Sequence, residues 1–438
     1  MHRLRRGTWT NWAGNQACRP AEVVRPSSEG SLRELVARAA EEQRRVKAVG
    51  AGHSFTAVAC TDGVLVDLDR YDEVLWVDRG VRQVCVQAGI PLWRLNEVLA
   101  RHELALENLG DIAYQSIAGA TQTATHGTGA RFRNLSAAIV GMRLIDGTGD
   151  VVECSAEVEP EVFASARVGI GALGLVSTVT LQCVPAFRLH AIEEPMLVDE
   201  VLEAIDELVA ANDHFELFWV PNTRWALIKR NHRTAQPPSP RPAWRTFYED
   251  VVLDNWGFRL MLEAGRFRND WIPRVARRLP SKGRVEYTDR SDLVFASPRL
   301  VPFYEMEYGV PREALVEAVQ RVRAIVDAGD RYIGFPVEVR TTAADDIPLS
   351  TASGRDTAYI AVHVYRRTPY REYFAAVEAA MVDLGGRPHW GKLHTRTAAD
   401  LAPAYPRWDE FQAVRARLDP EGRFANTYTD RVLGPVRG

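Results

Sequence analysis

At 438 residues, the chain exceeds the roughly 250–300 residues at which a single hydrophobic core stops growing, so two domains are expected. Its composition, 46% hydrophobic and 25% charged, is that of an ordinary globular protein, and a formal net charge of -3 argues against nucleic acid or an anionic membrane as partner. No apolar run approaches the roughly 20 residues of a membrane span, and the basic residues 1–7 lack the apolar stretch of a secretory signal. We therefore expect a cytoplasmic protein.

The five cysteines are odd in number, widely spaced and without a C-x-x-C pair. They predict neither a disulfide framework nor a zinc site, and we expect no bound metal.

The first part of the chain mixes short strands, helices and glycine clusters. Residues 31–44 carry apolar side chains at helical spacing behind Ser31, and Glu34 would complete a capping box. Residues 91–106 predict a second helix. Alternating patterns predict strands at residues 45–49, 63–78 and 82–90. Residues 137–155 predict two strands joined by a glycine-containing turn, which form a hairpin. This mixture favours an α+β domain shaped around a ligand.

The remainder of the chain predicts a second α+β domain. A helical pattern covers residues 312–329, and a strand pattern covers residues 356–367. Residues 234–245 are rich in proline and predict an exposed loop, which would widen the mouth of a site for a bulky substrate.

Three segments of the first domain, residues 49–55, 110–131 and 169–177, concentrate glycine and other small residues. Glycine lets backbone amides approach a ligand closely and converge on its oxygens. The first segment, VGAGHSF, is neither a G-x-G-x-x-G fingerprint nor a Walker A loop. Any one segment is explained as well by a turn in a strand-rich domain. Three together indicate a long phosphate-bearing cofactor such as a dinucleotide.

These segments resemble the flavin-binding loops of the vanillyl-alcohol oxidase superfamily. Three segments of the second domain, EVRTTAADDIPLS at 338–350, RDTAYIAVHVY at 355–365 and RPHWGKLH at 387–394, resemble sugar-1,4-lactone oxidases of the gulono- and arabinonolactone types and bacterial alditol oxidases. So do TNWAGN at 10–15 and DPEGRFANTYTDRVLG at 419–434. The resemblance covers nearly the whole chain.

The resemblance implies a two-domain α+β flavoprotein. Residues 1–185 would form a PCMH-type FAD-binding domain, residues 186–415 the substrate or cap domain, and residues 416–438 a segment that returns toward the FAD domain. The positions that it implies in FAD binding are Gly50, Ala51, Gly52, His53, Ser54, Gly110, Asp111, Ser116, Gly119, Ala120, Thr123, His126, Gly127, Gly129, Gly169, Gly174, Val176 and His389.

His53 matches the histidine that carries the flavin covalently, through the 8α-methyl carbon, in covalent members of this superfamily. A neutral imidazole nitrogen can attack the electrophilic quinone-methide form of a flavin. The alternative is a hydrogen-bonded turn histidine beside a free flavin. His126 would lie near the cofactor as a hydrogen-bonding residue rather than as the attachment point.

Four residues are candidates for the chemistry of the second domain. Glu338 and Arg340 stand two residues apart and would share one face of a strand, while Lys392 supplies a further cation. From the residues alone, the first two would equally form an ion pair between strands, and the lysine would lie on the surface. By resemblance, Arg340 and Lys392 stabilise a developing alkoxide, Glu338 orients the arginine and binds substrate hydroxyls, and His363 lies near the substrate.

The electron acceptor is expected to be oxygen. In plant-type lactone dehydrogenases of the superfamily an alanine near the flavin blocks oxygen, whereas this chain has Gly110 at the matching position. Asp111 departs from alditol oxidases, which have serine there.

The sequence therefore predicts an FAD-dependent oxidase that acts on a CH–OH group of a sugar-1,4-lactone or polyol and produces hydrogen peroxide. The alternatives are an alditol oxidase, a lactone dehydrogenase with another acceptor, a tailoring oxidase of a sugar-bearing natural product, and a flavin-binding protein without a redox substrate.

Overall fold

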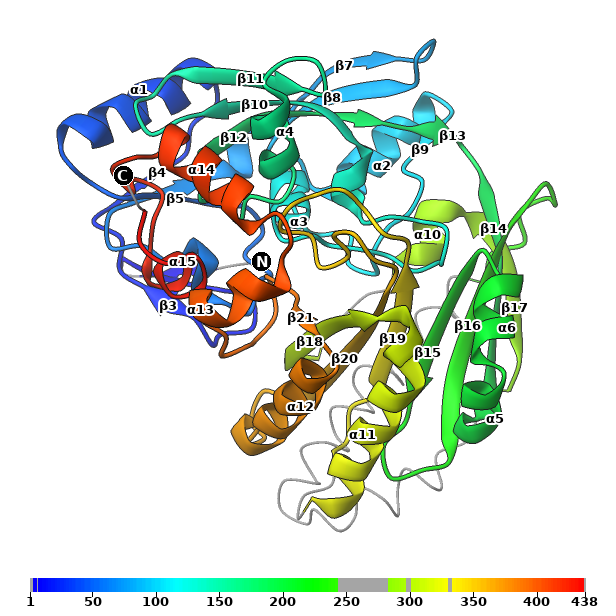
Figure 1. The fold of residues 1–438 in the computed structure, drawn as a ribbon. Helices are drawn as coiled ribbons and strands as arrows, with labels where there is room; N and C mark the ends of the chain where they lie inside the picture. Colours follow the sequence, from blue (N-terminus) through cyan, green and yellow to red (C-terminus); the bar gives the residue numbers. More distant parts are fainter. Residues whose placement is uncertain (1–2, 6, 243–282, 297–300, 330–332, 437–438) are drawn as a thin grey trace.

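The computed structural model describes residues 3–5, 7–242, 283–296, 301–329 and 333–436, which form two lobes (Figure 1). The upper lobe in that view contains the first part of the chain together with its C-terminal helices. The lower lobe contains a long antiparallel sheet with helices against it. This arrangement is the two-domain α+β fold that the sequence predicts.

Two main sheets build the first domain. The parallel sheet has the order β4-β6-β5, and the antiparallel sheet has the order β11-β10-β12-β8-β7. The central parallel strand β6 is buried along its whole length, as expected for a parallel strand covered on both faces. The strands are β4 (Glu22–Val24), β5 (Val46–Val49), β6 (Val64–Asp67), β7 (Val74–Asp78), β8 (Gln83–Gln87), β10 (Ile139–Ile145), β11 (Val151–Ser155) and β12 (Leu175–Gln182). The hairpin predicted at 137–155 is therefore confirmed as β10 and β11.

Small elements complete the domain. Three short strands at the N-terminus pair in order, β1 (Arg3–Arg5), β2 (Thr8–Thr10) and β3 (Ala17–Cys18), and β9 (Leu104–Ala105) pairs with β13 (Val184–Pro185). The helices are α1 (Glu29–Glu41), α2 (Leu92–Arg101), α3 (Ile117–Gln122) and α4 (Pro160–Ala166), with 3-10 turns η1 (Ala57–Ala59), η2 (Leu68–Arg70) and η3 (Leu135–Ala138).

Both predicted helix boundaries in this domain need correction. Helix α1 begins earlier than expected, because Ser28 rather than Ser31 caps it: the Ser28 side chain accepts from the Ser31 backbone, and Ser31 takes the place assigned to Glu34 in the capping box. Helix α2 ends at Arg101, because Glu103 adopts a left-handed backbone with φ +59°. Residues 104–105 leave the predicted helix and pair as strand β9.

The C-terminal part of the chain packs into the core of the first domain. Helices α13 (Ala398–Leu401), α14 (Trp408–Leu418) and α15 (Thr427–Leu433), with turn η6 (Ala402–Ala404), follow the second domain. Leu401 and Tyr405 already belong to the first domain's hydrophobic cluster, and α14 packs against α4. The apolar face of α14 explains this packing, since its buried residues recur at helical spacing at Trp408, Phe411, Val414 and Leu418. The chain thus returns to the first core before residue 416, where the return was expected.

The second domain is built on one antiparallel sheet in the order β17-β14-β16-β15-β19-β20-β18-β21. Its strands are β14 (Arg188–Leu197), β15 (His214–Trp219), β16 (Trp225–Thr234), β17 (Val285–Arg290), β18 (Phe303–Pro311), β19 (Val337–Thr342), β20 (Thr357–Tyr365) and β21 (Arg387–Pro388). The helices are α5 (Val198–Glu203), α6 (Ile205–Ala211), α10 (Ser291–Phe295), α11 (Leu315–Ala328) and α12 (Arg371–Asp383), with turn η5 (Arg312–Ala314). Helices α11 and α12 cover one face of the sheet (Figure 1).

Side-chain alternation gives the two faces of this sheet opposite characters. On β18, Met306, Tyr308 and Val310 join the apolar cluster with α11 and α12. The intervening residues Glu305 and Glu307 must point to the opposite face, because successive side chains of a strand alternate. The same alternation on the neighbouring strands puts Tyr359, Ala361, His363, Glu338 and Arg340 on this second face. A polar face therefore lies toward the first domain.

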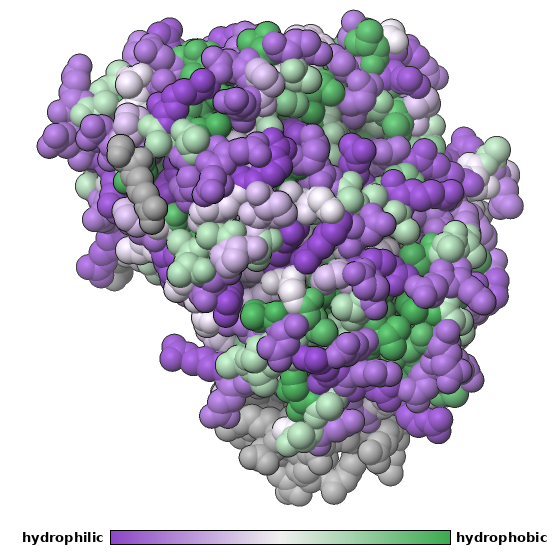
Figure 2. All heavy atoms as spheres, viewed as in Figure 1, coloured by the Kyte–Doolittle hydropathy of each residue, from purple (hydrophilic) through white to green (hydrophobic). Residues whose placement is uncertain are grey.

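The outer surface matches the composition. The face drawn in Figure 2 is mostly hydrophilic, and its hydrophobic residues gather on the lower half, over the second domain. None of the helices in the described part of the chain is long and apolar enough to cross a membrane. Residues 235–240 of the proline-rich segment are exposed as predicted, and residues 243–245 lie outside the described residues.

Lys47 on β5 connects three segments that are distant in sequence. Its side chain is almost completely buried, and Nζ donates hydrogen bonds to the carbonyl oxygens of Gly171 and Phe424, each at 2.9 Å. Burial lowers the pKa of Lys47 to about 7. An uncharged amine has two N–H donors, which match the two carbonyls.

We predict that Lys47→Met changes the pH dependence of stability. In the unfolded chain a lysine titrates near about 10.4, so between pH 7 and that value the unfolded state binds more protons than the folded state. Stability of the wild type should therefore rise with pH, by at most about 1.4 kcal/mol per pH unit, relative to the variant. Melting temperatures at pH 7, 8 and 9 measure this: the deficit of Lys47→Met relative to the wild type should widen as the pH rises. Parallel curves for Lys47→Met and the wild type would contradict the assignment.

Candidate active site

A long cavity lies in the first domain at the ends of its parallel strands. The loop after β5, helix α3 and the loop before β12 line it, and together they enclose about 920 Å³ of space, the open mouth included. Of the positions predicted to bind FAD, the cavity is lined by Gly50, Ala51, Gly52, His53, Ser54, Ser116, Gly119, Thr123, Gly174 and Val176. All three glycine-rich segments therefore reach one cavity.

The glycine at position 50 is required by close packing. A Cβ added to Gly50 would lie 1.9 Å from Oγ and 2.8 Å from Cβ of Ser116, the N-cap residue of α3. Gly52 has φ +68°, a conformation that other residues rarely adopt. Both glycines thus let the loop lie directly on the start of α3, where its backbone borders the cavity.

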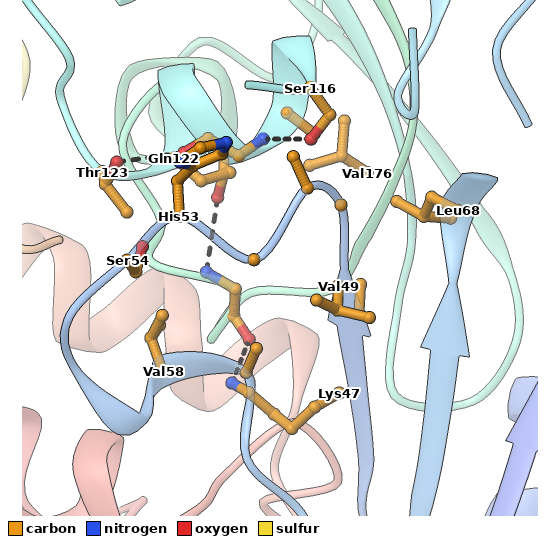
Figure 3. A pocket seen from close by; sticks show the side chains of 18 of the residues that line it. Lys47, Val49, His53, Ser54, Val58, Leu68, Ser116, Gln122, Thr123 and Val176 are labelled. Carbon is orange, nitrogen blue, oxygen red and sulfur yellow. Dashed lines mark hydrogen bonds between the residues drawn. The ribbon is translucent and has the colours of Figure 1, made fainter. Parts of the chain in front are cut away.

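His53 and Lys47 both line this cavity, and their side chains lie apart in the view of Figure 3. The ring of His53 stacks on Trp12 with ring centroids 5.6 Å apart. Its Nε2 atom is buried and has no hydrogen-bond partner among the described residues. Burial, with the nearby charge of Lys392, lowers the pKa of His53 to about 4. At neutral pH the ring is therefore an uncharged imidazole with a free lone pair.

Four predicted positions support the loops without lining a cavity. Ala120 is fully buried in α3. A Cβ at Gly127 would lie 2.3 Å from Oδ1 of Asn108, one at Gly129 would lie 2.4 Å from the Asp213 carbonyl, and one at Gly169 would lie 2.8 Å from Oε1 of Gln122. Close packing against a side-chain oxygen or a carbonyl accounts for the absence of a side chain at these three glycines.

A second cavity adjoins the first, since Gln115 lines both, and it lies on the polar face of the eight-stranded sheet. The structure brings all four predicted catalytic residues here, namely Glu338, Arg340, His363 and Lys392. Four of the positions assigned to FAD binding also line this cavity, namely Gly110, Asp111, His126 and His389. Residues from the first domain, from β18, β19 and β20, and from the segment after β21 thus meet at one place.

Arg340 is surrounded by carboxylates. Its guanidinium lies 2.5 Å from Glu338 on the same strand, 3.3 Å from Glu216 on β15 and 3.7 Å from Asp111 of the first domain. The pair with Glu338 is therefore formed along one strand, and Glu216 supplies the contact between strands. Burial alone would lower the pKa of Arg340, but these carboxylates hold it well above its ordinary value. The site thus contains a permanent, buried cation.

Lys392 is likewise held in the cavity and is not a surface lysine. Its Nζ forms an ion pair with Glu305 and lies 3.8 Å from Glu307. Burial opposes the charge, yet the two glutamates raise the pKa of Lys392 above its ordinary value. In return, although burial would raise it, the charge of Lys392 is the largest effect that lowers the pKa of Glu305, to about 2. The ammonium and the carboxylate are both charged at neutral pH.

Two histidines besides His363 border this group. His126 donates from Nδ1 to the Gly127 carbonyl, and its Nε2 lies 2.8 Å from Glu307. His389 accepts a hydrogen bond from the Gly391 amide at Nδ1, so its Nε2 must carry the proton. Ligand atoms of His126, Glu307 and His389 lie within 4.8 Å of one another, but this tautomer of His389 presents an N–H rather than a metal-binding lone pair. The hydrogen bonds thus favour a proton-bearing cluster over a metal site.

The sequence interpretation missed several residues of the site. Glu305 and Glu307 alternate with apolar residues along FYEMEYGVP, and that pattern was a readable signal for a functional strand face. Glu216 gave a weaker signal, because it is a single carboxylate between Phe215 and Leu217 on β15 and no second acidic residue of that strand alternates with it. Lys47, Gln115 and Gln122 also line the cavities.

These cavities define a class of protein, a two-domain flavoenzyme with a cofactor cavity in one domain and a charged reaction site at the domain boundary. The cofactor cavity fits FAD: its glycine loops approach closely, and His53 presents an unpartnered nitrogen. The profile of an FAD binding domain matches residues 20–155. The profile of D-arabinono-1,4-lactone oxidase matches residues 179–432, and the chain belongs to this family.

Comparison with known proteins agrees with this assignment. The chain is 48% identical to an L-gulono-1,4-lactone dehydrogenase of Mycobacterium tuberculosis, over 98% of this chain and 99% of that protein. It is 34% identical to an L-gulonolactone oxidase of Bos taurus, over 99% and 100% of the two chains. The crystal structure of a cholesterol oxidase from B. sterolicum has the same fold, with a TM-score of 0.82 and 18% identity over 99% of this chain and 98% of that one.

We predict that Gly50→Ala greatly lowers the FAD content of the purified protein, because the new Cβ would displace the loop from Ser116. Ser116→Gly removes both colliding atoms and costs little at an N-cap position. The double variant should therefore recover much of the lost FAD. Flavin absorbance per protein after gel filtration measures both effects.

Gly30→Ala is a matched control, since its Cβ would meet only Oγ of Ser28, at 3.9 Å, within α1. It should leave FAD content unchanged. Equal FAD content in Gly50→Ala and the wild type would show that the loop does not need this close approach.

Proposed function

We propose that this protein is an FAD-dependent oxidoreductase that oxidises a CH–OH group of an aldono-1,4-lactone. The observation that carries the proposal is the pair of fixed cations, Arg340 and Lys392, in a cavity that adjoins the FAD cavity. Family membership and two gulonolactone-oxidising relatives support the choice of a sugar lactone as substrate. When bound, FAD supplies the two-electron acceptor that takes the hydride of the carbinol carbon.

The two cations stabilise negative charge on the reacting oxygen. As the hydroxyl loses its proton, charge develops on that oxygen, and cations fixed in a buried site stabilise it more strongly than water does. Arg340 keeps its orientation because Glu338, Glu216 and Asp111 surround it. Both cations are already in place before the reaction, so little reorganisation is needed.

Carboxylates of the same cavity bind the neutral substrate. Glu338 and Asp111 line the cavity and present acceptor oxygens, which suit the several hydroxyl donors of a sugar lactone. We assign Glu338 to two tasks, orientation of Arg340 and acceptance of a substrate hydroxyl. Asp111 comes from the first domain and would bring the substrate against the flavin.

We further propose oxygen as the electron acceptor. Gly110 lines the reaction cavity without a side chain, and an added Cβ would meet the carbonyl oxygen of His126 at 3.1 Å. The contact shows that a side chain at this position would be closely packed, and its absence matches the position at which alanine blocks oxygen in plant-type lactone dehydrogenases of the superfamily; this match supports oxygen as the acceptor. The relatives carry both names, dehydrogenase and oxidase, so the acceptor must be tested directly.

Under anaerobic conditions, L-gulono-1,4-lactone or D-arabinono-1,4-lactone should bleach the flavin absorbance of the purified protein. Polyols such as xylitol should bleach it at least tenfold more slowly. Lys392→Met should slow bleaching about 100–1000-fold, the range seen when one group that stabilises an oxyanion is removed. Stopped-flow absorbance measures these rates. An enzyme that no aldonolactone reduces would contradict the proposal.

The acceptor is measured on the lactone-reduced enzyme. Admission of air should restore the oxidised spectrum within seconds and yield one hydrogen peroxide per flavin. Slow recovery in air with fast recovery on addition of a redox dye would instead assign a dehydrogenase.

We also propose that His53 is the covalent attachment point of the flavin. Its buried Nε2 lacks a partner among the described residues, and its lowered pKa keeps a lone pair available for attack on the 8α-carbon. The stack on Trp12 holds the ring in one orientation.

Acid precipitation tests this assignment without reference to activity. The wild-type precipitate should retain the yellow flavin, whereas His53→Ala should release it into the supernatant. His102→Ala, at the end of α2, is the control and should retain it. Complete release of flavin by the wild type would reject covalent attachment.

A further inference from the structure

Two histidines of the reaction cavity meet two glutamates of one strand in the same manner. Nδ1 of His363 donates to the Pro336 carbonyl at 3.1 Å, and Nε2 faces Glu305 at 3.4 Å. Nδ1 of His126 donates to the Gly127 carbonyl at 2.9 Å, and Nε2 faces Glu307 at 2.8 Å. Lys392 contacts both glutamates. The five groups form a row in which cationic and anionic groups alternate.

The backbone contacts fix the tautomer of each histidine. A carbonyl oxygen only accepts hydrogen bonds, so each Nδ1 must carry a proton. In a neutral ring, Nε2 then carries a lone pair, and this lone pair faces a carboxylate that is also an acceptor. A proton at Nε2 converts this contact into an imidazolium–carboxylate pair. Each pair is therefore built to hold one additional proton.

The two pairs differ in access. His126 is buried, and its ring stacks on Tyr359 with centroids 3.5 Å apart, so its short contact with Glu307 is a closed pair. His363 is only partly buried, and its contact with Glu305 is 0.6 Å longer, the difference between 3.4 and 2.8 Å. The ring centroids of Phe303 and Phe335 lie 5.3 and 6.2 Å from that of His363, and the two rings pack against its imidazole. Its Nε2 is the one that a substrate hydroxyl can reach.

We propose that His363 is the proton acceptor of the reaction, with Glu305 as its counter-charge; this rests on the proposed oxidation of a lactone CH–OH group. The hydroxyl proton passes to Nε2 of neutral His363, and a new N–H bond forms as the O–H bond breaks. The electron pair left on oxygen forms the C=O bond, while the hydride of the same carbon reduces the flavin by two electrons. His363 later returns its proton to solvent.

The charges around His363 suit this role. Glu305 lies opposite it on the neighbouring strand and stabilises the imidazolium that forms. Lys392 is held by the same carboxylate, so it stays fixed beside the reacting oxygen. The other titratable or charged groups that line the cavity are Asp111, His126, Glu307, Glu338, Arg340 and His389. The short contact between His126 and Glu307 is buried beneath the stacked ring of Tyr359, which leaves His363 as the histidine whose Nε2 a substrate hydroxyl can meet.

The first test is the rate of anaerobic flavin reduction by an aldonolactone from about pH 5 to pH 8, the range in which histidine titrates. The wild-type rate should fall toward low pH, because a protonated His363 accepts no proton. His363→Gln should reduce the rate at neutral pH by about 100-fold or more and abolish this fall. Glu305→Gln should move the fall to lower pH, because the imidazolium loses its counter-charge.

His190→Gln is the matched control. This histidine has a similar environment, with Nδ1 at 3.2 Å from Thr288 and Nε2 at 3.6 Å from Glu286, but it lies on β14 away from the cavity. It should keep the wild-type rate and pH profile. Flavin content and melting temperature show whether each variant is folded. A folded His363→Gln variant with the wild-type rate and pH profile would overturn the proposal.

A second measurement does not depend on turnover. It is an NMR measurement on protein with ¹⁵N-labelled histidine. The signals of His363 are those that disappear in His363→Gln. They should show a ring with its proton on Nδ1, whose Nε2 gains a proton as the pH falls. An Nε2–H ring would overturn the proposal even if no lactone reduced the wild type. If His363 shows the expected tautomer but no lactone is oxidised, the proposed substrate class is rejected. The assignment of His363 as proton acceptor would then still be supported.

Discussion

The structure depends on the burial of Glu305 and Glu307, two residues apart on one strand. Both carboxylates are almost completely shielded from water, and a buried carboxylate is strongly unfavourable unless it is paired. No partner for them comes from their own strand: Lys392 follows β21, His363 lies on β20, and His126 belongs to the first domain. Charge pairing therefore requires these segments to converge, and it places the proposed reaction site at the domain boundary.

The same constraint explains why the large sheet has two different faces. One face needs only apolar side chains to pack on α11 and α12, and any helix with an apolar stripe would satisfy it. The other face carries Glu338, Arg340, Glu305 and Glu307, and it can be stable only against a surface that supplies complementary groups. The first domain supplies Asp111 and His126. Backbone bonds reinforce this contact, since the Gly129 amide donates to the Thr341 carbonyl. Domain packing and site assembly are thus one event.

Much of this could be predicted from the sequence, and the failures have physical causes. The glycine segments together indicated close backbone approach, and Gly50 confirms it, because an added Cβ would lie 1.9 Å from Oγ of Ser116. The end of α2 depends on the left-handed backbone of Glu103, a residue that does not favour that conformation by itself. The apolar spacing of α14 does not indicate which core this helix joins, so the point at which the chain returns to the first domain could not be placed from the sequence. Glu305 and Glu307 were missed because glutamates on a strand usually face solvent.

Lys392 shows why such a site needs more carboxylates than its chemistry alone requires. A lone buried ammonium would lose its proton, since burial opposes the charge, and it would then stabilise no alkoxide. Glu305 keeps it charged, but a single carboxylate would also neutralise its field at the substrate. A protonated His363 on the far side of Glu305 offsets that carboxylate, and protonated His126 offsets Glu307 in the same way. When both histidines carry their protons, the row has three cations and two anions, so in the proposed reaction the excess positive charge appears as the substrate oxygen gives up its proton.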